Sequence, residues 1–293
     1  MKSKISFVHN FQAQARNNWN DGLAAAMRIL AKDYEVIYDT TETFEEADVI
    51  LVWGGSYSPE AEWLRNLDHP RKVLLYAGGP LDVGYFERIH HVVLETPTDS
   101  IQDTSTSYAF GTNTMLFKPQ NAPKLFDGIL PAGYAAWKRQ HIFADALGSR
   151  GLLCGPKQDI ETECYVYPES RGVLTLPEVS PAVLPYFYSA SYALVNTASY
   201  WGGCQRTILE AMACGIPVIV MADSSRNKWF IDDSGNGYIV EPHPQAIKEA
   251  IQKIKERTWD TRRYVMEKWP ETKYARDLES AFLPLLTGQG EST

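Results

Sequence analysis

The chain has 293 residues, of which 44% are hydrophobic and 22% are charged. This length is enough for one large globular domain or for two of about 120–150 residues. The formal net charge of −8 opposes nonspecific binding to nucleic acid, because such binding depends on Lys and Arg side chains that neutralise phosphates. The composition therefore excludes a strongly basic nucleic-acid-binding protein.

Targeting segments and cysteine pairs are not expected. No run approaches the ~20 apolar residues of a membrane span, and the first residues have no signal-peptide pattern, so we expect a cytoplasmic protein without stable membrane insertion. The cysteines lack C-x-x-C spacing, so we expect them to be reduced and to form neither a disulfide framework nor a zinc site. They are Cys154, Cys164, Cys204 and Cys214.

Strand-length apolar runs alternate with longer amphipathic segments from the start of the chain. A helix is expected at Asn20–Lys32, and strands are expected at Lys4–His9, Glu35–Tyr38, Asp48–Trp53, Lys72–Tyr76 and His91–Leu94. This alternation is typical of βαβ units around a parallel sheet. Because open α/β sheets bind ligands beyond the carboxyl ends of their strands, turns such as Gly54-Gly55 and Gly78–Pro80 are candidate binding loops.

The alternation pauses at Phe117–Lys124, where two prolines and several polar residues oppose regular structure, and we place an interdomain linker there. A second series follows, with helices expected at Ala135–Leu147, Gln245–Lys255 and Ala275–Leu286 and strands at Asp127–Leu130, Gly151–Cys154, Tyr165–Tyr167, Gly172–Thr175, Tyr192–Val195, Pro217–Met221 and Gly237–Val240. The sequence thus predicts an α/β protein with two Rossmann-like, doubly wound domains. The expected boundaries are 1–119, 120–265 and a final segment, 266–293, with a helix and a disordered tail.

One segment of the second domain carries the clearest chemistry. Strand Tyr192–Val195 leads into a turn with Gly202 and Gly203, and a helix is expected at Cys204–Ala213. The glycines allow close backbone approach, while the N–H groups and the dipole at the helix start attract a diphosphate.

Two side chains of this helix suit a nucleotide. Arg206 adds direct charge compensation, and Glu210, one turn further along, is placed to accept hydrogen bonds from ribose hydroxyls. From this segment alone, an alternative stays open in which the glycines only form a tight turn and the helix only contributes to the core.

A family resemblance enters at Leu209–Val218, which resembles the donor-site signature of the group 1 family of retaining GT-B glycosyltransferases. Thr114–Pro119 is similar to the segment that leads into the interdomain linker of that family. Trp137-Lys138 resembles its basic site after the first strand of the second domain, and Gly237–Pro242 and Lys268–Glu271 also fit. The resemblance covers the second domain well and the first only by its general α/β pattern.

The resemblance implies a GT-B architecture, in which two Rossmann-like domains face each other across a cleft. The first domain would hold a hydroxyl-bearing acceptor, whose class stays open and includes a modified nucleic-acid base. The second would hold the donor, a nucleotide diphosphate sugar such as a UDP-sugar. The implied reaction is transfer of a hexosyl or related sugar with retention, with no obligatory cofactor and no dedicated metal site.

The resemblance also implies roles for individual residues. Lys138 would neutralise the diphosphate and act in catalysis, and Glu210 would contact the donor ribose. Phosphate oxygens would be held around the start of the helix by Gly202, Gly203, Cys204, Gln205, Arg206 and Thr207. Arg139 is a candidate second cation, and a surface role for it is an equal alternative.

Three positions depart from the family pattern. Gly202 stands where a second Glu is usual, Gly133 where an Arg is usual, and Ala77-Gly78 where a His is often found after the fourth strand of the first domain. Two alternatives to sugar transfer therefore stay open. One is a noncatalytic nucleotide-sugar-binding protein, and the other is a nucleotide-sugar epimerase or hydrolase of the same fold.

The first domain offers Asp82 as the ionisable partner of an acceptor hydroxyl, with a helix N-cap as its alternative role. His90-His91 does not predict a metal site, because adjacent residues of a strand point to opposite faces. Asp232-Asp233 lies in a run of turn-forming residues and is interpreted as a loop. The aromatic cluster at 186–188, with Tyr192 and Tyr200-Trp201 nearby, is assigned to the core by default, with a place beside the nucleotide base or sugar as the alternative.

Overall fold

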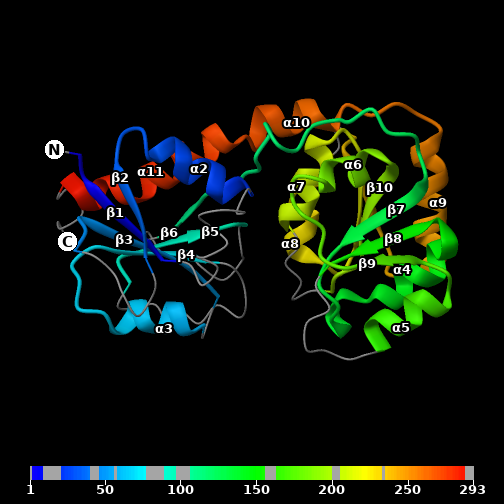
Figure 1. Ribbon diagram of the computed structural model, residues 1–293, viewed down its shortest axis with the longest axis horizontal. Coiled ribbons are helices and arrows are strands. Elements are labelled where there is room, and N and C mark those ends of the chain that lie inside the picture. Colours follow the sequence, from blue (N-terminus) through cyan, green and yellow to red (C-terminus); the bar gives the residue numbers. More distant parts are fainter. Residues whose placement is uncertain are drawn as a thin grey trace. The chain divides into compact units, whose positions relative to one another are not determined.

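The computed structural model describes residues 2–8, 21–39, 46–55, 58–76, 89–96, 106–155, 163–199, 205–232 and 235–287. The chain forms two compact units, one of residues Met1–Gly111 together with Pro270–Thr293 and one of residues Thr112–Trp269. Each unit contains a six-stranded, fully parallel sheet flanked by helices (Figure 1). The predicted α/β class with two Rossmann-like sheets is confirmed.

The first unit has the strand order β2-β1-β3-β4-β5-β6. Its strands are β1 (Lys4–Val8), β2 (Glu35–Asp39), β3 (Val49–Gly54), β4 (Lys72–Tyr76), β5 (His91–Leu94) and β6 (Thr106–Tyr108), and its helices are α2 (Gly22–Leu30), α3 (Pro59–Asn66) and α11 (Glu271–Thr287). The central strands are apolar on both faces because helices cover both, as parallel sheets require. The strands expected at Lys72–Tyr76 and His91–Leu94 form with those bounds.

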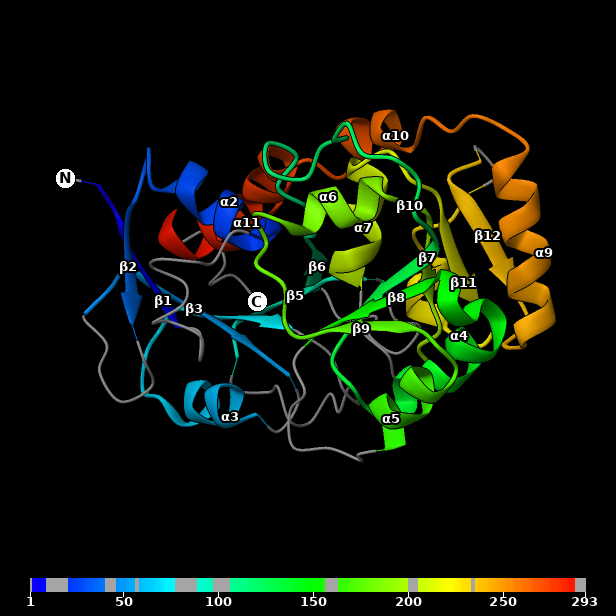
Figure 2. The same cartoon turned by 45° about the vertical axis from the view of Figure 1, so that its right-hand side comes forward.

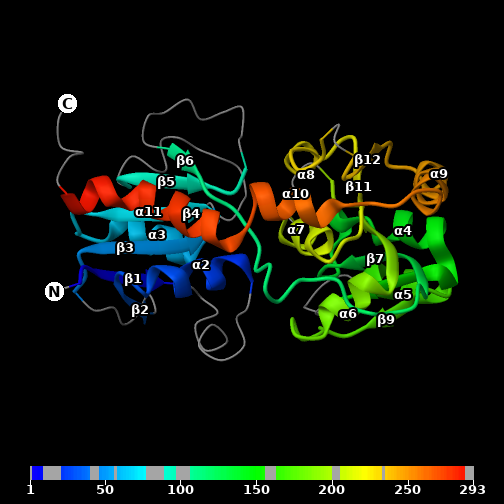
Figure 3. The same cartoon turned by 90° about the horizontal axis from the view of Figure 1, so that it is seen from above.

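Helix α11 packs beside α2 within the first unit, although α2 is near the start of the chain and α11 near its end (Figure 3). Tyr34, which follows α2, donates a hydrogen bond of 2.7 Å to Glu279 and meets the Phe282 ring edge-on at a centroid distance of 5.3 Å. The apolar face of α11 is thus buried against the first unit. The structural units therefore divide after Gly111 and after Trp269, whereas the predicted boundaries lie after residues 119 and 265. The predicted tail, residues 288–293, lies outside the described residues.

The second unit has the strand order β12-β11-β10-β7-β8-β9. Its strands are β7 (Phe126–Pro131), β8 (Gly151–Cys154), β9 (Leu174–Leu176), β10 (Ser191–Asn196), β11 (Val218–Met221) and β12 (Gly237–Val240). Its α-helices are α4 (Gln140–Leu147), α5 (Glu163–Ser170), α6 (Leu184–Ser189), α7 (Gln205–Ala213), α8 (Ser225–Lys228), α9 (Pro244–Lys255) and α10 (Thr261–Lys268), and its 3-10 helices are η2 (Ala136–Lys138) and η3 (Gly148–Arg150).

Helices α4 and α9 cover one face of this sheet and share its main hydrophobic core (Figure 2). Leu130 of β7 and Val195 of β10 point into that core, whereas the adjacent Ile129 and Leu194 are buried on the opposite face, where α7 packs. The strand expected at Tyr165–Tyr167 is wrong, since these residues belong to α5. Tyr167 donates a 2.8 Å hydrogen bond to Asp145 of α4, so contact with that helix outweighs local β propensity.

The strand order decides where a ligand binds to the second unit. Chain order along the sheet reverses between β7 and β10, which lie side by side although strands β8 and β9 come between them in sequence. In open α/β sheets, ligands bind outside the carboxyl ends of the strands at such a switch point. The loops that follow Pro131 and Asn196 are therefore the candidate site of this unit.

We expect Gly237→Ala to destabilise the second unit. A Cβ atom at this position of β12 would lie 2.1 Å from the carbonyl oxygen of Val218 on β11, and a backbone atom cannot move away as a flexible side chain does. Overpacking of this kind costs roughly 1–3 kcal/mol. Scanning calorimetry should show a lower unfolding temperature for this variant than for Ile239→Ala, the exposed neighbour on the same strand. Equal unfolding temperatures for the two variants would contradict the prediction.

Candidate functional site

The loops after β7 and β10 are joined by hydrogen bonds at the switch point. The amide of Ser199 donates to the carbonyl of Trp137 over 2.9 Å, and the hydroxyl of Thr197 donates to the carbonyl of Lys138 over 2.6 Å. Thr197 is fully buried. Because the two loops share these bonds, the 3-10 turn η2 is held at a fixed place beside the end of β10.

Lys138 lies in η2 and is only 7% exposed. Its Nζ atom stands 3.8 Å from the centroid of the Trp137 ring, within the range of a cation–π contact. Trp137 itself is 41% exposed, so the indole holds the ammonium group while part of the ring faces solvent. This arrangement orients a single cation at the carboxyl end of β7.

Arg139 ties the switch-point loops to the loop after β11. Its backbone is left-handed, with φ of 52°, a conformation that a non-glycine residue seldom adopts. The guanidinium donates to the carbonyls of Thr197 (2.7 Å) and Ala198 (3.1 Å) and, in a bidentate pair, to both carboxylate oxygens of Asp223 (2.6 and 2.8 Å). Hydrogen bonds from Arg139 lower the pKa of the Asp223 carboxyl. Arg139 therefore organises the loops, and Asp223 neutralises its charge.

The predicted diphosphate cradle is described only in part. Gly202, Gly203 and Cys204 lie outside the described residues. Helix α7 begins at Gln205, so Gln205, Arg206 and Thr207 form its first turn as predicted; the Arg206 side chain is exposed and that of Thr207 is half-buried. The start of α7 follows β10 at the switch-point edge, and its N–H groups and dipole favour an anion there.

Glu210 lies one turn into α7 and is 7% exposed. Its Oε2 atom accepts a hydrogen bond of 2.9 Å from the hydroxyl of Tyr188, which is fully buried. Burial and then the nearby Glu210 raise the pKa of Tyr188, and the same two causes raise the pKa of the Cys154 thiol to about 12 and that of Cys214 further. Glu210 thus lies beside three groups whose raised pKa values keep them protonated at neutral pH, namely the Tyr188 hydroxyl and the thiols of Cys154 and Cys214.

Two buried polar atoms near the switch point have no hydrogen-bond partner among the described residues. They are Nδ2 of Asn196, at the end of β10, and Oε1 of Gln140, at the start of α4. Gln140 donates through its other amide atom to the carbonyl of Gly133, and Asn196 accepts from the amide of Ala198. A buried polar atom left unpaired is costly, so these two are candidates to meet a bound ligand.

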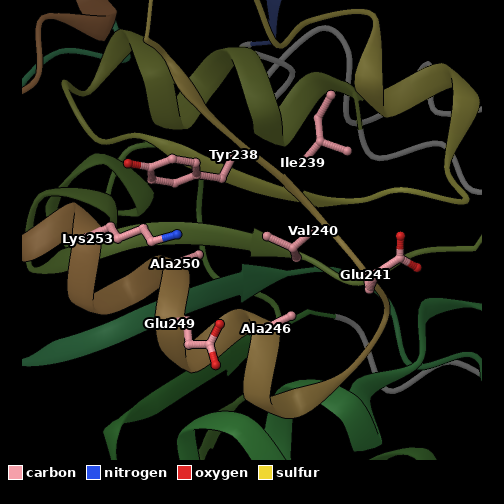
Figure 4. Close-up of a pocket in the computed structure, with 8 residues that line it drawn as sticks. All are labelled: Tyr238, Ile239, Val240, Glu241, Ala246, Glu249, Ala250 and Lys253. Carbon is pink, nitrogen blue, oxygen red and sulfur yellow. The ribbon is translucent and has the colours of Figure 1, made fainter.

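Two cavities lined by described residues of the second unit lie outside the loops that follow β10. One of about 230 Å³ lies between β12 and α9 (Figure 4) and contains none of the predicted site residues. Another, of about 520 Å³, lies between the start of α4 and α5 and includes Gln140 and His141. The second cavity thus reaches the start of α4, where the unpaired Oε1 atom of Gln140 lies.

Comparison with known proteins finds a family match within the second unit. Residues 152–270 match the model of the family "Glycosyl transferases group 1", a segment that includes helix α7 and Glu210. The match begins after Lys138 and Arg139. No curated protein matches the chain.

Solved structures with the same fold extend over nearly the whole chain. A glycosyltransferase from Rickettsia africae ESF-5 superposes with a TM-score of 0.69 at 14% identity, covering 97% of this chain and 99% of that one. Anabaena HepE in complex with UDP and glucose gives 0.67 at 14% identity, with coverages of 95% and 98%. Sucrose-phosphate synthase from Thermosynechococcus elongatus gives 0.64 at 15% identity, with 99% and 98%. At these identities the likeness shows the fold, which is GT-B.

The candidate site of the second unit includes residues that sequence reasoning did not select. Thr197 and Asp223 were not predicted, and Tyr188 was assigned to the core by default, yet each bonds directly to a predicted residue or its backbone. Local sequence signals for them are weak: Tyr188 belongs to an aromatic run assigned to the core, and Asp223 is a single carboxylate after a strand. Asp82, the predicted partner of the acceptor, lies in the first unit and outside the described residues.

The residues that the sequence analysis rejected as metal ligands and that the structure describes have partners within the protein. His91 makes a 2.8 Å hydrogen bond with Ser107, His90 accepts one from the amide of Lys72, and Lys268 donates to Asp232 over 2.9 Å. Within the described ranges, no group of three or more His, Cys, Asp or Glu side chains is placed to hold a metal ion. A search of the same residues found no helix with the length and apolarity that crossing a bilayer needs.

We expect Asp223→Asn to lower the thermal stability of the domain in a pH-dependent way. The folded pKa of Asp223 is below its ordinary value of 3.8, so the ionised carboxylate stabilises the fold above that value. This contribution is lost as the pH falls through the lowered pKa. The gap between the unfolding temperatures of wild type and variant should therefore be largest near neutral pH and should close below pH 3.8.

Unfolding temperatures measured from pH 7 downwards check this prediction. The control is Asp68→Asn, which removes an exposed carboxylate from the first unit. A gap for Asp223→Asn that is independent of pH, or no larger than that of the control, would contradict it.

Proposed function

We propose that this protein transfers a hexosyl or related sugar from a nucleotide diphosphate sugar to a hydroxyl-bearing acceptor, with retention. The observation that carries the proposal is the β10–α7 unit at the switch point, within the segment that matches the group 1 glycosyl transferase family, with Glu210 one turn into the helix. A helix terminus suits the diphosphate, and a carboxylate one turn further along suits the ribose.

The chemistry of the site fits the departure of a diphosphate. Charge develops on the leaving phosphate as the bond to the anomeric carbon breaks, and preorganised donors at that point lower the barrier. Lys138, held against Trp137, supplies a fixed cation, and the first turn of α7 supplies N–H groups, with Arg206 beside them. We assign the main cationic role to Lys138, which stands at the basic position that the resemblance marks, and a supporting role to Arg139, which is paired with Asp223.

Retention follows in this proposal from attack on the same face as the departing diphosphate. The acceptor hydroxyl forms a bond to the anomeric carbon while the bond to the diphosphate breaks, and a diphosphate oxygen takes the hydroxyl proton. No side-chain nucleophile is needed, so a glycine at position 202 is compatible with the reaction. Asp82 is proposed to orient the acceptor hydroxyl from the first unit. The acceptor class stays open and includes a modified nucleic-acid base.

A UDP-sugar is the first donor to test. Anabaena HepE, which has a similar fold, was solved with UDP and glucose and also with UDP-glucose. The proposal needs no obligatory cofactor beyond the donor. A thermal-shift screen of nucleotide sugars identifies the donor, because a ligand that binds only the folded state raises the unfolding temperature.

The second candidate function is donor binding without turnover, and Gly202 and Gly133 favour it because both stand where the family usually has charged side chains. Binding of a UDP-sugar with no release of UDP over a broad acceptor panel would support it. Release of free sugar without an acceptor would indicate a hydrolase, and a changed sugar still attached to the nucleotide would indicate an epimerase.

We expect Glu210→Ala to weaken donor binding more than it lowers stability, because the carboxylate would accept hydrogen bonds from ribose. Loss of a hydrogen bond to a charged group costs roughly 1.5–3 kcal/mol, which is about a tenfold to hundredfold loss of affinity. Calorimetric titration with the nucleotide sugar found in the screen measures the change. Glu249→Ala, on helix α9, is the control. Unchanged affinity in Glu210→Ala would remove the ribose role from this residue.

We expect Lys138→Ala to lower kcat by about 10²–10³, the loss typical of removing one group that stabilises developing charge. The effect on KM should be smaller, since the charge on the leaving phosphate grows in the transition state. Release of UDP at saturating donor measures kcat, with Lys255→Ala as control, because Lys255 pairs with Asp127 near the amino end of β7. If kcat is unaltered, the phosphate role belongs to Arg206 or Arg139.

A further inference from the structure

Tyr188 forms a side-chain hydrogen bond with Glu210, the residue predicted to contact the donor ribose. It lies on α6, in the stretch between β9 and β10, and its hydroxyl donates to Oε2 of Glu210 over 2.9 Å. Both residues are buried, Tyr188 completely and Glu210 to all but 7% of its surface. The contact joins residues 22 positions apart on two different helices.

The position of Tyr188 is fixed by the segment that leads into the second unit. Phe117, which is 1% exposed, meets the Tyr188 ring edge-on at a centroid distance of 6.3 Å. The next residue on α6, Ser189, accepts a 2.9 Å hydrogen bond from the amide of Gln120. Arg262 of α10 donates both to the carbonyl of Phe117 and to that of Ala213, at the end of α7. Arg262 therefore links the segment that packs against Tyr188 to the helix that carries Glu210.

Packing alone does not require the hydroxyl of Tyr188. A phenylalanine would fill the same space in an apolar core, whereas a buried hydroxyl without a partner costs free energy. Burial and the adjacent carboxylate raise the pKa of Tyr188, so it keeps its proton and donates. A phenol has only one hydrogen to donate, and here it points to Oε2 of Glu210.

We propose that Tyr188 is a positioning residue. It orients the Glu210 carboxylate toward the ribose of the donor and thereby increases the affinity for the donor. The inference rests on the proposed function, in which Glu210 accepts hydrogen bonds from ribose hydroxyls. The hydrogen bond from Tyr188 restricts the rotation of the Glu210 carboxylate before the nucleotide binds. Less conformational entropy is then lost on binding, and such preorganisation increases affinity. Tyr188 does not touch the reacting atoms in this assignment.

The test compares ribonucleotides with analogues that lack the ribose hydroxyls. UDP, GDP and ADP are titrated first into the wild-type protein, and the tightest of them is then compared with its 2′,3′-dideoxy form. We expect Tyr188→Phe to weaken the ribonucleotide about tenfold and to leave the affinity for the dideoxy form unchanged. The ratio of the two affinities should therefore fall. Tyr186→Phe, on the same helix with a 43% exposed side chain, is the matched control and should preserve the ratio.

A purely structural role for Tyr188 gives a different result. Disturbed packing would weaken both nucleotides by the same factor, and equal losses would overturn the proposal, as would no loss at all. If Tyr188→Phe does not accumulate as folded protein, Tyr188→Met removes the hydroxyl while keeping an apolar side chain of adaptable shape, and the same ratio is measured. Melting temperatures and circular dichroism establish that each variant is folded.

Glu210→Gln separates failure of this inference from failure of the proposed function. If Glu210→Gln lowers the ratio and Tyr188→Phe does not, Tyr188 has no positioning role but the ribose role of Glu210 stands. If Glu210→Gln leaves the ratio unchanged, the ribose assignment itself fails and the inference falls with it. If both single variants lower the ratio, the double variant should lower it no further than Glu210→Gln alone, because the two residues would act through one interaction.

Discussion

The hydrogen bonds of Arg139 hold the candidate site together. This one side chain bonds the backbone that follows β10 and the carboxylate that follows β11, while its own backbone follows β7. Three strand ends that the sheet places in a row are thereby tied at their tips. Lys138 precedes Arg139, and its carbonyl accepts from Thr197, so the orientation of the predicted catalytic cation depends on the same junction. A left-handed backbone at Arg139 is the conformational cost of that turn.

The second half of the site depends on a different kind of contact. Glu210 is a buried carboxylate, and leaving such a group without a donor would be expensive. Tyr188 supplies the donor from α6, and α6 in turn is packed against the start of the second unit through Phe117. The proposed diphosphate end of the site is thus organised by the ion pair of Arg139 with Asp223, and the proposed ribose end by a neutral hydroxyl in the core.

The departures from the family pattern have a clear distribution. Gly133 follows β7, and Gly202 belongs to the stretch between β10 and α7 that lies outside the described residues. Lys138 and Glu210 match the family pattern, and each has a contact within the unit, Lys138 with the Trp137 ring and Glu210 with the Tyr188 hydroxyl.

The sequence by itself determined the parallel α/β class, most of the strands and the helix that carries Glu210, because alternating apolar runs, glycines and helix starts are local signals. It did not determine the helix at Tyr165–Tyr167 or the place of α11 in the first unit, since both follow from contacts with distant elements, Asp145 of α4 and Tyr34 after α2. Only the tertiary structure decided that Arg139 pairs with Asp223, 84 residues away, and that Tyr188 bonds Glu210. Long-range pairs of single polar residues leave no periodic trace in a sequence, because each depends on how the strands are ordered in the sheet.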